Sequence, residues 1–180
     1  MSNEVNIHPF EKESAFELAL CHLLSEHGWS SEVLVQPTEE ELVQNWADII
    51  FDMNRDRERL GNYPLTPTEI QQIIDKVNTC GSPYKVNKFI NGKFVSIKRD
   101  NPDDTFNNGK EVYLKIFDPT EISAGQSRYQ IVRQPRFRAT HPLAGDRRGD
   151  VMLLINGMPV IHVELKRSRV DVSQAVFQLK

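Results

Sequence analysis

The chain has 180 residues, of which 39% are hydrophobic and 26% are charged, and its formal net charge is −3. This composition matches an ordinary globular domain and excludes a disordered or fibrous protein. The first ten residues lack a basic and apolar leader, no stretch has the ~18 apolar residues of a membrane span, and the two cysteines stand far apart. We therefore expect no export, no membrane association, no zinc site and no disulfide framework, and a reducing cytoplasm is the expected location.

The first part of the chain predicts three amphipathic helices. Apolar residues recur at helical spacing over residues 11–27, and Gly28 follows as a natural stop. Helices are also expected over residues 38–53 and 66–77, because each begins with a threonine three residues before a glutamate and continues as one apolar stripe. The latter two helices are interpreted as purely structural.

After residue 77 the apolar period changes from helical to alternating. The Asn91-Gly92 pair in "KFINGKFVSIKR" favours a hairpin, and "NPDDTFNNGK" is typical of a polar loop. Four further strands are expected from "EVYLKIF", "RYQIVRQ", "DVMLLI" and "PVIHVELKR", and a final helix from "VDVSQAVFQLK". The sequence thus predicts an α/β fold in which an early helix packs on a central sheet.

Basic residues gather in the last third of the chain. Residues 128–169 contain nine basic and three acidic side chains, a formal charge of +6, so the remainder carries −9. A phosphodiester substrate requires such cations, although a solvated basic face would give the same pattern. We expect a positive rim that includes Arg133, Arg136, Arg147, Arg148, Arg167 and Arg169.

The stretch "GDVMLLINGMPVIHVELKRS" places Asp150, Glu164 and Lys166 beside segments that otherwise resemble buried strands. A charge taken out of water is costly unless it is paired or bound to a metal. One explanation is an ion pair at the end of a half-exposed strand. The other is phosphodiester hydrolysis, in which the two acids supply oxygen ligands to a hard cation. Lys166, on the same strand face as Glu164, would then orient water and stabilise developing charge.

The turn at Asn156-Gly157 decides whether the two acids can share a cation. A two-residue loop would place Asp150 opposite Val163, on the face away from Glu164. A three-residue loop over residues 155–157 would place both acids on one face. We therefore predict the three-residue loop, or another register shifted by an even number of residues, including one shifted through a bulge.

The ordered set of "GDV", a hairpin and "VELK" resembles the core of PD-(D/E)xK nucleases. The longer string "RRGDVMLLINGMPVIHVELKR" is similar to the N-terminal nuclease domain of the R subunit of type I restriction-modification enzymes. "SAFELALCHLLSEHGW" resembles the opening helix, which implies Glu17 as its glutamate, and "VFQLK" resembles the start of the Q-x-x-x-Y helix, which implies Gln178. Two residues beside the motif depart from the family pattern: His162 stands where an apolar residue is usual, and Ser168 stands where proline is common. We expect His162 to be hydrogen-bonded to a neighbouring residue rather than to lie next to a metal.

The resemblance implies a Mg²⁺-dependent endonuclease with a restriction-endonuclease-like core, a central mixed β-sheet flanked by helices. It implies one nuclease domain over residues 1–180, an N-terminal module of a longer chain, with a helical and hairpin elaboration at 38–125 and a catalytic core at 126–180. Asp150, Glu164, Lys166 and Gln178 would be catalytic, and Glu17 would join the two acids as a metal ligand. Duplex DNA and separate modification and specificity subunits would be partners, while ATP would act only through motor domains, since the chain has no P-loop motif.

Two alternatives remain open at this point. A catalytically silent domain with the nuclease fold would only hold DNA or a partner subunit, and it would have no use for a carboxylate metal site. Another PD-(D/E)xK nuclease, of the repair or junction type, would differ chiefly in the length of its natural chain.

Overall fold

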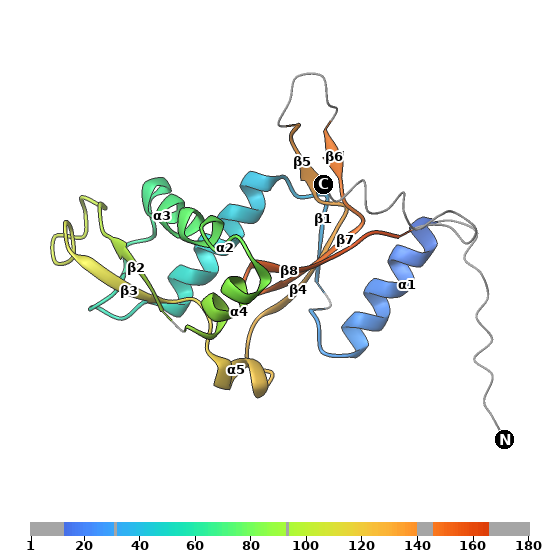
Figure 1. The fold of residues 1–180 in the computed structure, drawn as a ribbon, viewed down its shortest axis with the longest axis horizontal. Helices are drawn as coiled ribbons and strands as arrows, with labels where there is room; N and C mark the ends of the chain where they lie inside the picture. The colour runs from blue at the N-terminus through green and yellow to red at the C-terminus, as the bar shows by residue number, and fades with distance from the viewer. Residues whose placement is uncertain (1–12, 31, 93, 140–145, 166–180) are drawn as a thin grey trace. The chain divides into compact units, whose positions relative to one another are not determined.

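The computed structural model describes residues 13–30, 32–92, 94–139 and 146–165 (Figure 1). The chain divides into two compact units: unit 1 comprises residues 1–39, 130–154 and 159–180, and unit 2 comprises residues 40–129 and 155–158. The predicted α/β class is confirmed by a four-stranded mixed sheet accompanied by helices. The expectation of one nuclease domain over residues 1–180 stays a prediction. Within the described ranges, no helix has the length and apolar character needed to cross a membrane.

The mixed sheet has the strand order β1-β4-β7-β8. These strands are β1 (Val33–Val35), β4 (Tyr129–Arg133), β7 (Val151–Ile155) and β8 (Met158–Val163). β1 and β4 run parallel, with Val35 opposite Arg133. β7 is buried along most of its length, as its continuous apolar run predicts for a strand inside a sheet.

Helix α1 (Glu13–Glu26) lies within the range predicted for the first helix, and it packs on the sheet through a small apolar core. Cys21 on the helix joins Ile131, Val151 and Leu153 on the strands, and all four side chains are buried. The same helix carries Glu17, which is only 4% exposed. An acid buried on the core side of a helix requires a specific partner.

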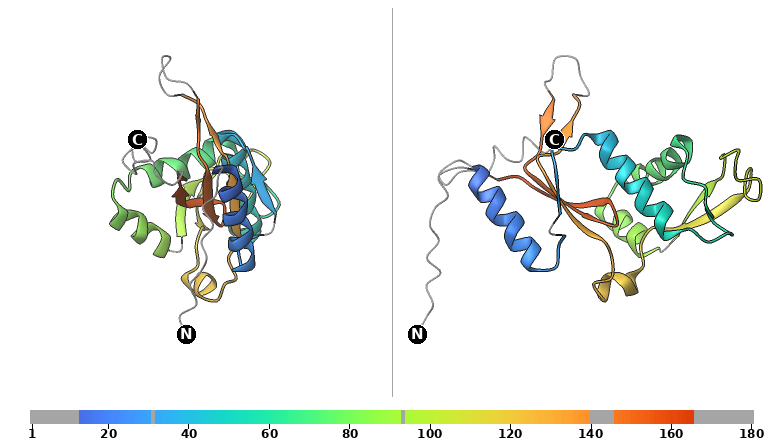
Figure 2. Two further views of the ribbon diagram at one scale, coloured as in Figure 1. Left: turned by 90° about the vertical axis from the view of Figure 1, so that its right-hand side faces the viewer. Right: turned by 180° about the vertical axis from the view of Figure 1, so that it is seen from behind.

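A two-stranded ribbon extends the β4–β7 pair beyond the sheet. It consists of β5 (Arg136–Phe137) and β6 (Arg147–Arg148), which pair antiparallel with Arg136 opposite Arg148. Backbone bonds from Gly149 to Pro135 and from Gln134 to Asp150 continue the same register toward the sheet. We call residues 136–139 and 146–148 the arm, and Figures 1 and 2 show it extending from the end of β4 and the start of β7. Its strands are too short for the sequence pattern to predict.

Unit 2 is built from helices and one hairpin around the larger apolar core. Its elements are α2 (Glu39–Met53), α3 (Pro67–Asn78), α4 (Pro83–Asn91), β2 (Phe94–Lys98), β3 (Glu111–Lys115) and α5 (Pro119–Ser123). The predicted capping box of α3 is confirmed, because the Thr66 hydroxyl accepts from the Glu69 amide and the Glu69 carboxylate accepts from the Thr66 amide. Arg99, fully buried, pairs with Glu69 and Asp104 and so holds the loop between β2 and β3 in place.

The hairpin predicted at Asn91-Gly92 is wrong. Residues 83–91 form α4, whose N-cap is Ser82 and whose first turn contains a proline, and Gly92 is the C-cap. Asn-Gly serves equally as a hairpin turn and as a helix end, and here the Ser-Pro start selects the helix. The hairpin in this region instead joins β2 to β3, with Val95 opposite Leu114, across the polar loop that the sequence predicted.

Candidate active site

Asp150 and Glu164 lie at the same end of the β7–β8 hairpin. Asp150 immediately precedes β7, and Glu164 immediately follows β8. In an antiparallel hairpin the start of the first strand and the end of the second are adjacent. The fold therefore brings together two acids that are separated by the whole hairpin in sequence.

The turn of this hairpin differs from our prediction. β7 ends at Ile155 and β8 begins at Met158, so the turn contains only Asn156 and Gly157, with φ values of 50° and 82°. Positive φ at both central residues is the type I′ geometry, which matches the twist of a two-residue hairpin. The three-residue loop is wrong because Asn156 adopts the left-handed conformation, where its side chain accepts from the Arg128 amide and donates to the Ile116 carbonyl.

Regular alternation from a two-residue turn would direct the two acids to opposite faces, but neither acid lies in regular strand. Asp150 is at a bend, and its Oδ2 accepts a 2.6 Å hydrogen bond from the amide of Leu165, the residue after Glu164. This bond draws the first acid toward the end of β8. The positions of the acids are thus set by contacts at the hairpin end rather than by strand register.

His162 lies against the second acid of the motif. Its Nε2 lies 3.1 Å from Oε1 of Glu164, whose side chain is only 7% exposed. Burial lowers the pKa of His162 from its usual value, and the Asp150 carboxylate opposes that shift. A neutral imidazole with its proton on Nε2 would donate to Glu164, so the neighbour expected for His162 is the second acid of the motif.

Gly149 makes room for this histidine. A Cβ built on Gly149 would lie 2.5 Å from Nε2 of His162, closer than real Cβ contacts. The glycine of the "GDV" motif therefore allows the imidazole to lie against the chain beside Asp150. This steric role is visible only when β6, β7 and β8 are assembled.

Glu17 reaches the same region from α1 through Gln134. Nε2 of Gln134 donates a 2.8 Å hydrogen bond to Oε2 of Glu17, and the Gln134 amide donates to the Asp150 carbonyl at 2.7 Å. Oε1 of Gln134 accepts from Nε2 of Gln36 at 3.1 Å. Sequence reasoning missed both glutamines, although each precedes a proline, a signal that its backbone avoids the right-handed helical region.

The donor set of the two acids is suited to Mg²⁺, which binds through one or two carboxylates and keeps several waters. Among the residues that the structure describes, no three His, Cys, Asp or Glu side chains are grouped closely enough to hold a metal ion. Direct ligation by Glu17 stays a prediction, and the Glu17 carboxylate accepts a hydrogen bond from Gln134. Lys166, Gln178, Arg167 and Arg169, which we also assigned to the site or its rim, lie outside the described residues.

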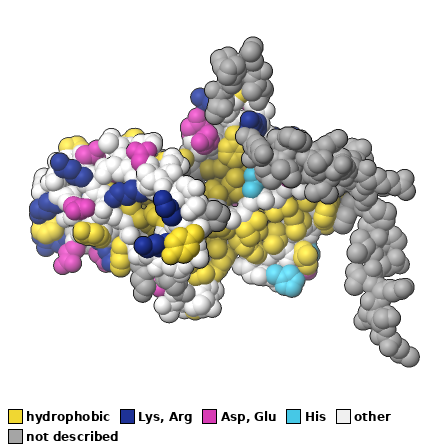
Figure 3. All heavy atoms as spheres, in the orientation of Figure 1, with side chains coloured by type: hydrophobic (Ala, Val, Ile, Leu, Met, Phe, Trp, Pro, Cys, Tyr) yellow, Lys and Arg dark blue, Asp and Glu magenta, His cyan; other side chains and the backbone are white. Residues whose placement is uncertain are grey.

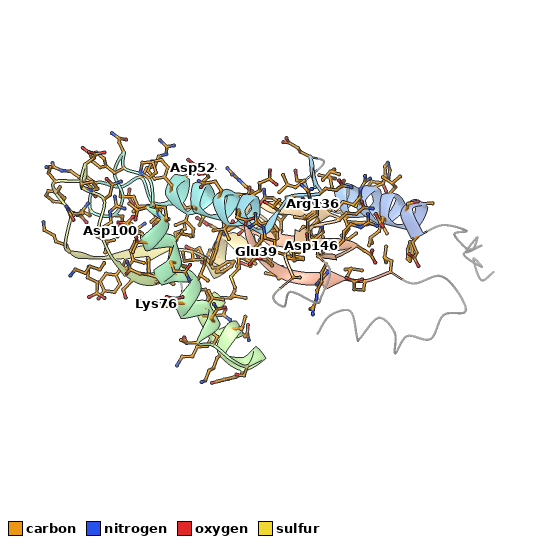
Figure 4. All side chains as sticks on the ribbon, turned by 90° about the horizontal axis from the view of Figure 1, so that it is seen from above. Glu39, Asp52, Lys76, Asp100, Arg136 and Asp146 are labelled. Atoms are coloured by element: carbon orange, nitrogen blue, oxygen red, sulfur yellow. The ribbon has the colours of Figure 1, made fainter. Side chains whose placement is uncertain are left out.

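Three of the predicted rim arginines lie on the arm. Arg136, Arg147 and Arg148 are exposed, and Figure 4 labels Arg136 on one strand and Asp146 beside the other. Nε of Arg136 donates to the Gln36 carbonyl at 2.9 Å, which fixes that side chain at the base of the arm. Figure 3 shows Lys and Arg side chains on both sides of the arm.

Arg133 lies on β4 rather than on the arm. Its Nε is buried and has no hydrogen-bond partner among the described residues. Its guanidinium opposes the rise that burial causes in the pKa of Cys21, so the two side chains are near one another. A contact of Arg133 with DNA stays a prediction, and the structure gives the arm arginines the more exposed positions.

Comparison with known proteins is consistent with this geometry. The family model described as "Type I restriction enzyme R protein N terminus" matches residues 10–180. An endonuclease subunit of a type I restriction enzyme from Staphylococcus saprophyticus is 28% identical over 170 residues, which are 94% of this chain and 16% of the relative. A corresponding subunit from Staphylococcus aureus is 27% identical over 171 residues, 95% of this chain and 16% of the relative. The chain thus spans about one sixth of the length of these relatives, and it belongs to the family of type I restriction enzyme R protein N-terminal regions.

Proposed function

We propose that this chain is the Mg²⁺-dependent endonuclease module of a type I restriction-modification system and hydrolyses phosphodiester bonds of duplex DNA. The observation that carries the proposal is the convergence of Asp150 and Glu164 at one end of the β7–β8 hairpin, in a member of the R protein family. The family membership favours this activity over a repair or junction nuclease with the same motif.

In the proposed reaction the residues have distinct roles. A bound divalent cation would polarise the phosphoryl group and lower the pKa of water. Asp150 and Glu164 would hold that cation with carboxylate oxygens. Lys166 orients the attacking water and stabilises negative charge that develops in the transition state. Gln178 positions the lysine or a phosphate, as the family resemblance implies.

The arm supplies the DNA contact in this proposal. Arg147 and Arg148 are exposed on β6, and only Gly149 stands between Arg148 and Asp150. Phosphate contacts position a protein on the duplex without reading sequence. Arginines on a ribbon whose register continues through Asp150 would therefore place the phosphate backbone relative to the acid.

The remaining parts of the activity are assigned to other components. Site recognition and translocation would come from separate modification and specificity subunits and from ATP-dependent motor domains of a longer chain. The cytoplasm is the proposed location, since duplex DNA and these subunits must be met there. Each of these assignments rests on family membership rather than on a contact in the structure.

One observation favours a second candidate, a catalytically silent domain that only docks DNA or a subunit. Glu164 faces His162, and the described residues contain no three-ligand group. Cation binding discriminates between the two candidates, because a docking domain needs none. Calorimetry with Mg²⁺ on the 180-residue chain should show binding that Asp150→Asn and Glu164→Gln abolish.

The matched control is Glu111→Gln, which neutralises an exposed acid on β3 and should leave cation affinity unchanged. Absence of Mg²⁺ binding by the unmodified chain would contradict the nuclease proposal and support the docking candidate. Binding that survives both Asp150→Asn and Glu164→Gln would also contradict it, since the cation would then lie elsewhere.

A further inference from the structure

Two glutamines with left-handed backbone conformation stand side by side where parallel strands end. Gln36 follows β1 and has φ of 54°, while Gln134 follows β4 and has φ of 55°. The residues before them, Val35 and Arg133, are partners in the parallel ladder. Non-glycine residues rarely adopt this conformation, and such strain persists only where the surroundings impose it.

The two side chains are joined in a fixed order. Nε2 of Gln36 donates to Oε1 of Gln134, which turns Nε2 of Gln134 toward Glu17, where it donates to Oε2 at 2.8 Å. An amide held at its oxygen by a donor can present only its NH₂ group on the other side. Gln36 thus sets the orientation in which Gln134 meets the acid.

Gln134 also contacts the strand that carries the first acid of the motif. Its backbone amide donates to the Asp150 carbonyl at 2.7 Å, one residue from the bond between Gly149 and Pro135. One residue therefore holds the buried Glu17 carboxylate with its side chain and the backbone of Asp150 with its main chain. Glu17 is 4% exposed, so this bond satisfies a carboxylate that has little access to water.

We propose that Gln134, oriented by Gln36, is a positioning residue that fixes Glu17 relative to Asp150, and that divalent-cation affinity depends on this relation. The inference rests on the proposed function, because it assigns Glu17 a part in the surroundings of the cation. Partners of this kind, which orient groups around a metal, are commonly worth 10–100-fold in metal affinity. If the hydrogen bonds of Gln134 had no role in the site, they would contribute only to the stability of the fold.

The test uses Gln134→Asn in the 180-residue chain. Asparagine tolerates the left-handed backbone and keeps the amide, but its side chain is one methylene shorter and loses the reach to Glu17. The Mg²⁺ dissociation constant measured by calorimetry should rise at least about tenfold, while the urea midpoint in chelator stays close to that of the unmodified chain. The matched control is Gln44→Asn, which removes a 2.7 Å glutamine-to-carboxylate bond to Asp48 on the exposed face of α2 and should change neither quantity.

A double variant that exchanges the acid and the amide between positions 17 and 134 distinguishes an effect on cation binding from an effect on stability. Glu17→Gln combined with Gln134→Glu restores a hydrogen bond between the two positions but moves the carboxylate from α1 to the end of β4. Stability should recover relative to Gln134→Glu alone, whereas Mg²⁺ affinity should not. Recovery of both stability and Mg²⁺ affinity would overturn the proposal, because any hydrogen bond between the two positions would then be enough for cation binding.

The outcomes distinguish this inference from the proposed function. If the unmodified chain binds Mg²⁺ and Gln134→Asn binds it equally well, the positioning role is wrong and the nuclease proposal stands. A lower number of binding sites with an unchanged dissociation constant indicates partial unfolding, and it equally contradicts the positioning role. If the unmodified chain binds no Mg²⁺, both proposals fail.

Discussion

The backbone amide of Leu165 donates a 2.6 Å hydrogen bond to Oδ2 of Asp150, so the chain beyond β8 is tied to the acid that precedes β7. This bond does not depend on a negative charge, because a side-chain amide oxygen can accept it as well. The carboxylate consequently has a structural function in addition to the proposed ligand function, and the two can be separated by substitution.

Asp150→Asn should keep the fold near its original stability, while Asp150→Ala should lower the free energy of unfolding by about 1–3 kcal/mol. The alanine variant leaves the Leu165 amide without its acceptor, which is the costly arrangement for a part-buried donor. Urea denaturation in chelator measures the difference. Equal stability of the two variants would show that the Leu165 bond contributes nothing.

Asn156→Ala should destabilise the chain by about 2–4 kcal/mol. Alanine disfavours the φ of 50° at this position and removes both the acceptor of the Arg128 amide and the donor to the Ile116 carbonyl. Asn156→Gly also loses both bonds but tolerates the positive φ, so its urea midpoint should lie between those of alanine and the unmodified chain. An alanine variant as stable as the glycine variant would contradict this account of the turn.

Arg147→Ala and Arg148→Ala should weaken duplex DNA binding and make it less dependent on salt. Each lost phosphate contact should reduce the slope of log affinity against log salt concentration by about 0.9. Fluorescence anisotropy with a labelled duplex at several salt concentrations gives this slope. Arg55→Ala on unit 2, where Arg55 pairs with Asp52, is the control, and an equal effect of that variant would remove the arm from the DNA interface.

Cys21 should react with iodoacetamide much more slowly than Cys80 near pH 8. Cys21 is 5% exposed, and burial raises the pKa of its thiol, with Glu17 adding to the rise and Arg133 opposing it. A thiol whose pKa is higher in the folded state holds its proton more tightly there, so its contribution to stability is present below about pH 8.5 and is lost as the pH rises through the folded-state pKa. Mass spectrometry after brief alkylation identifies the faster cysteine, and faster modification of Cys21 would contradict its packing against the sheet.

Local sequence signals predicted those parts of the fold that depend on neighbouring residues. The Thr66 to Glu69 capping box is confirmed because both of its bonds join residues three apart. Asn91-Gly92 misled the prediction because its dipeptide fits two local structures, and the choice depended on Ser82 nine residues earlier. Asn156 misled it differently, since its left-handed backbone is held by Arg128 and Ile116, which lie far away in sequence.

In the candidate site, too, features that depend on neighbouring residues could be predicted, whereas contacts between residues far apart in sequence could not. Asp150 and Glu164 could be recognised from their charge beside apolar strands, and the structure brings them to one hairpin end. The Gln36 and Gln134 pair could not be found this way, because its members are 98 residues apart and meet only when two parallel strands align. Sequence patterns therefore indicate candidate reactive groups, while the contacts around those groups become visible only in the fold.

The most direct test of the central claim is DNA cleavage by the assembled restriction enzyme that carries Asp150→Asn, Glu164→Ala or Lys166→Ala. Each variant should lose at least ~10²-fold in cleavage rate, because it removes a cation ligand or a donor aimed at transition-state charge, while its thermal unfolding stays cooperative. A structural ion pair predicts the reverse, with lost stability and retained cleavage. Plasmid linearisation at the unmodified rate by any of these variants in a folded state would contradict the role assigned to that residue.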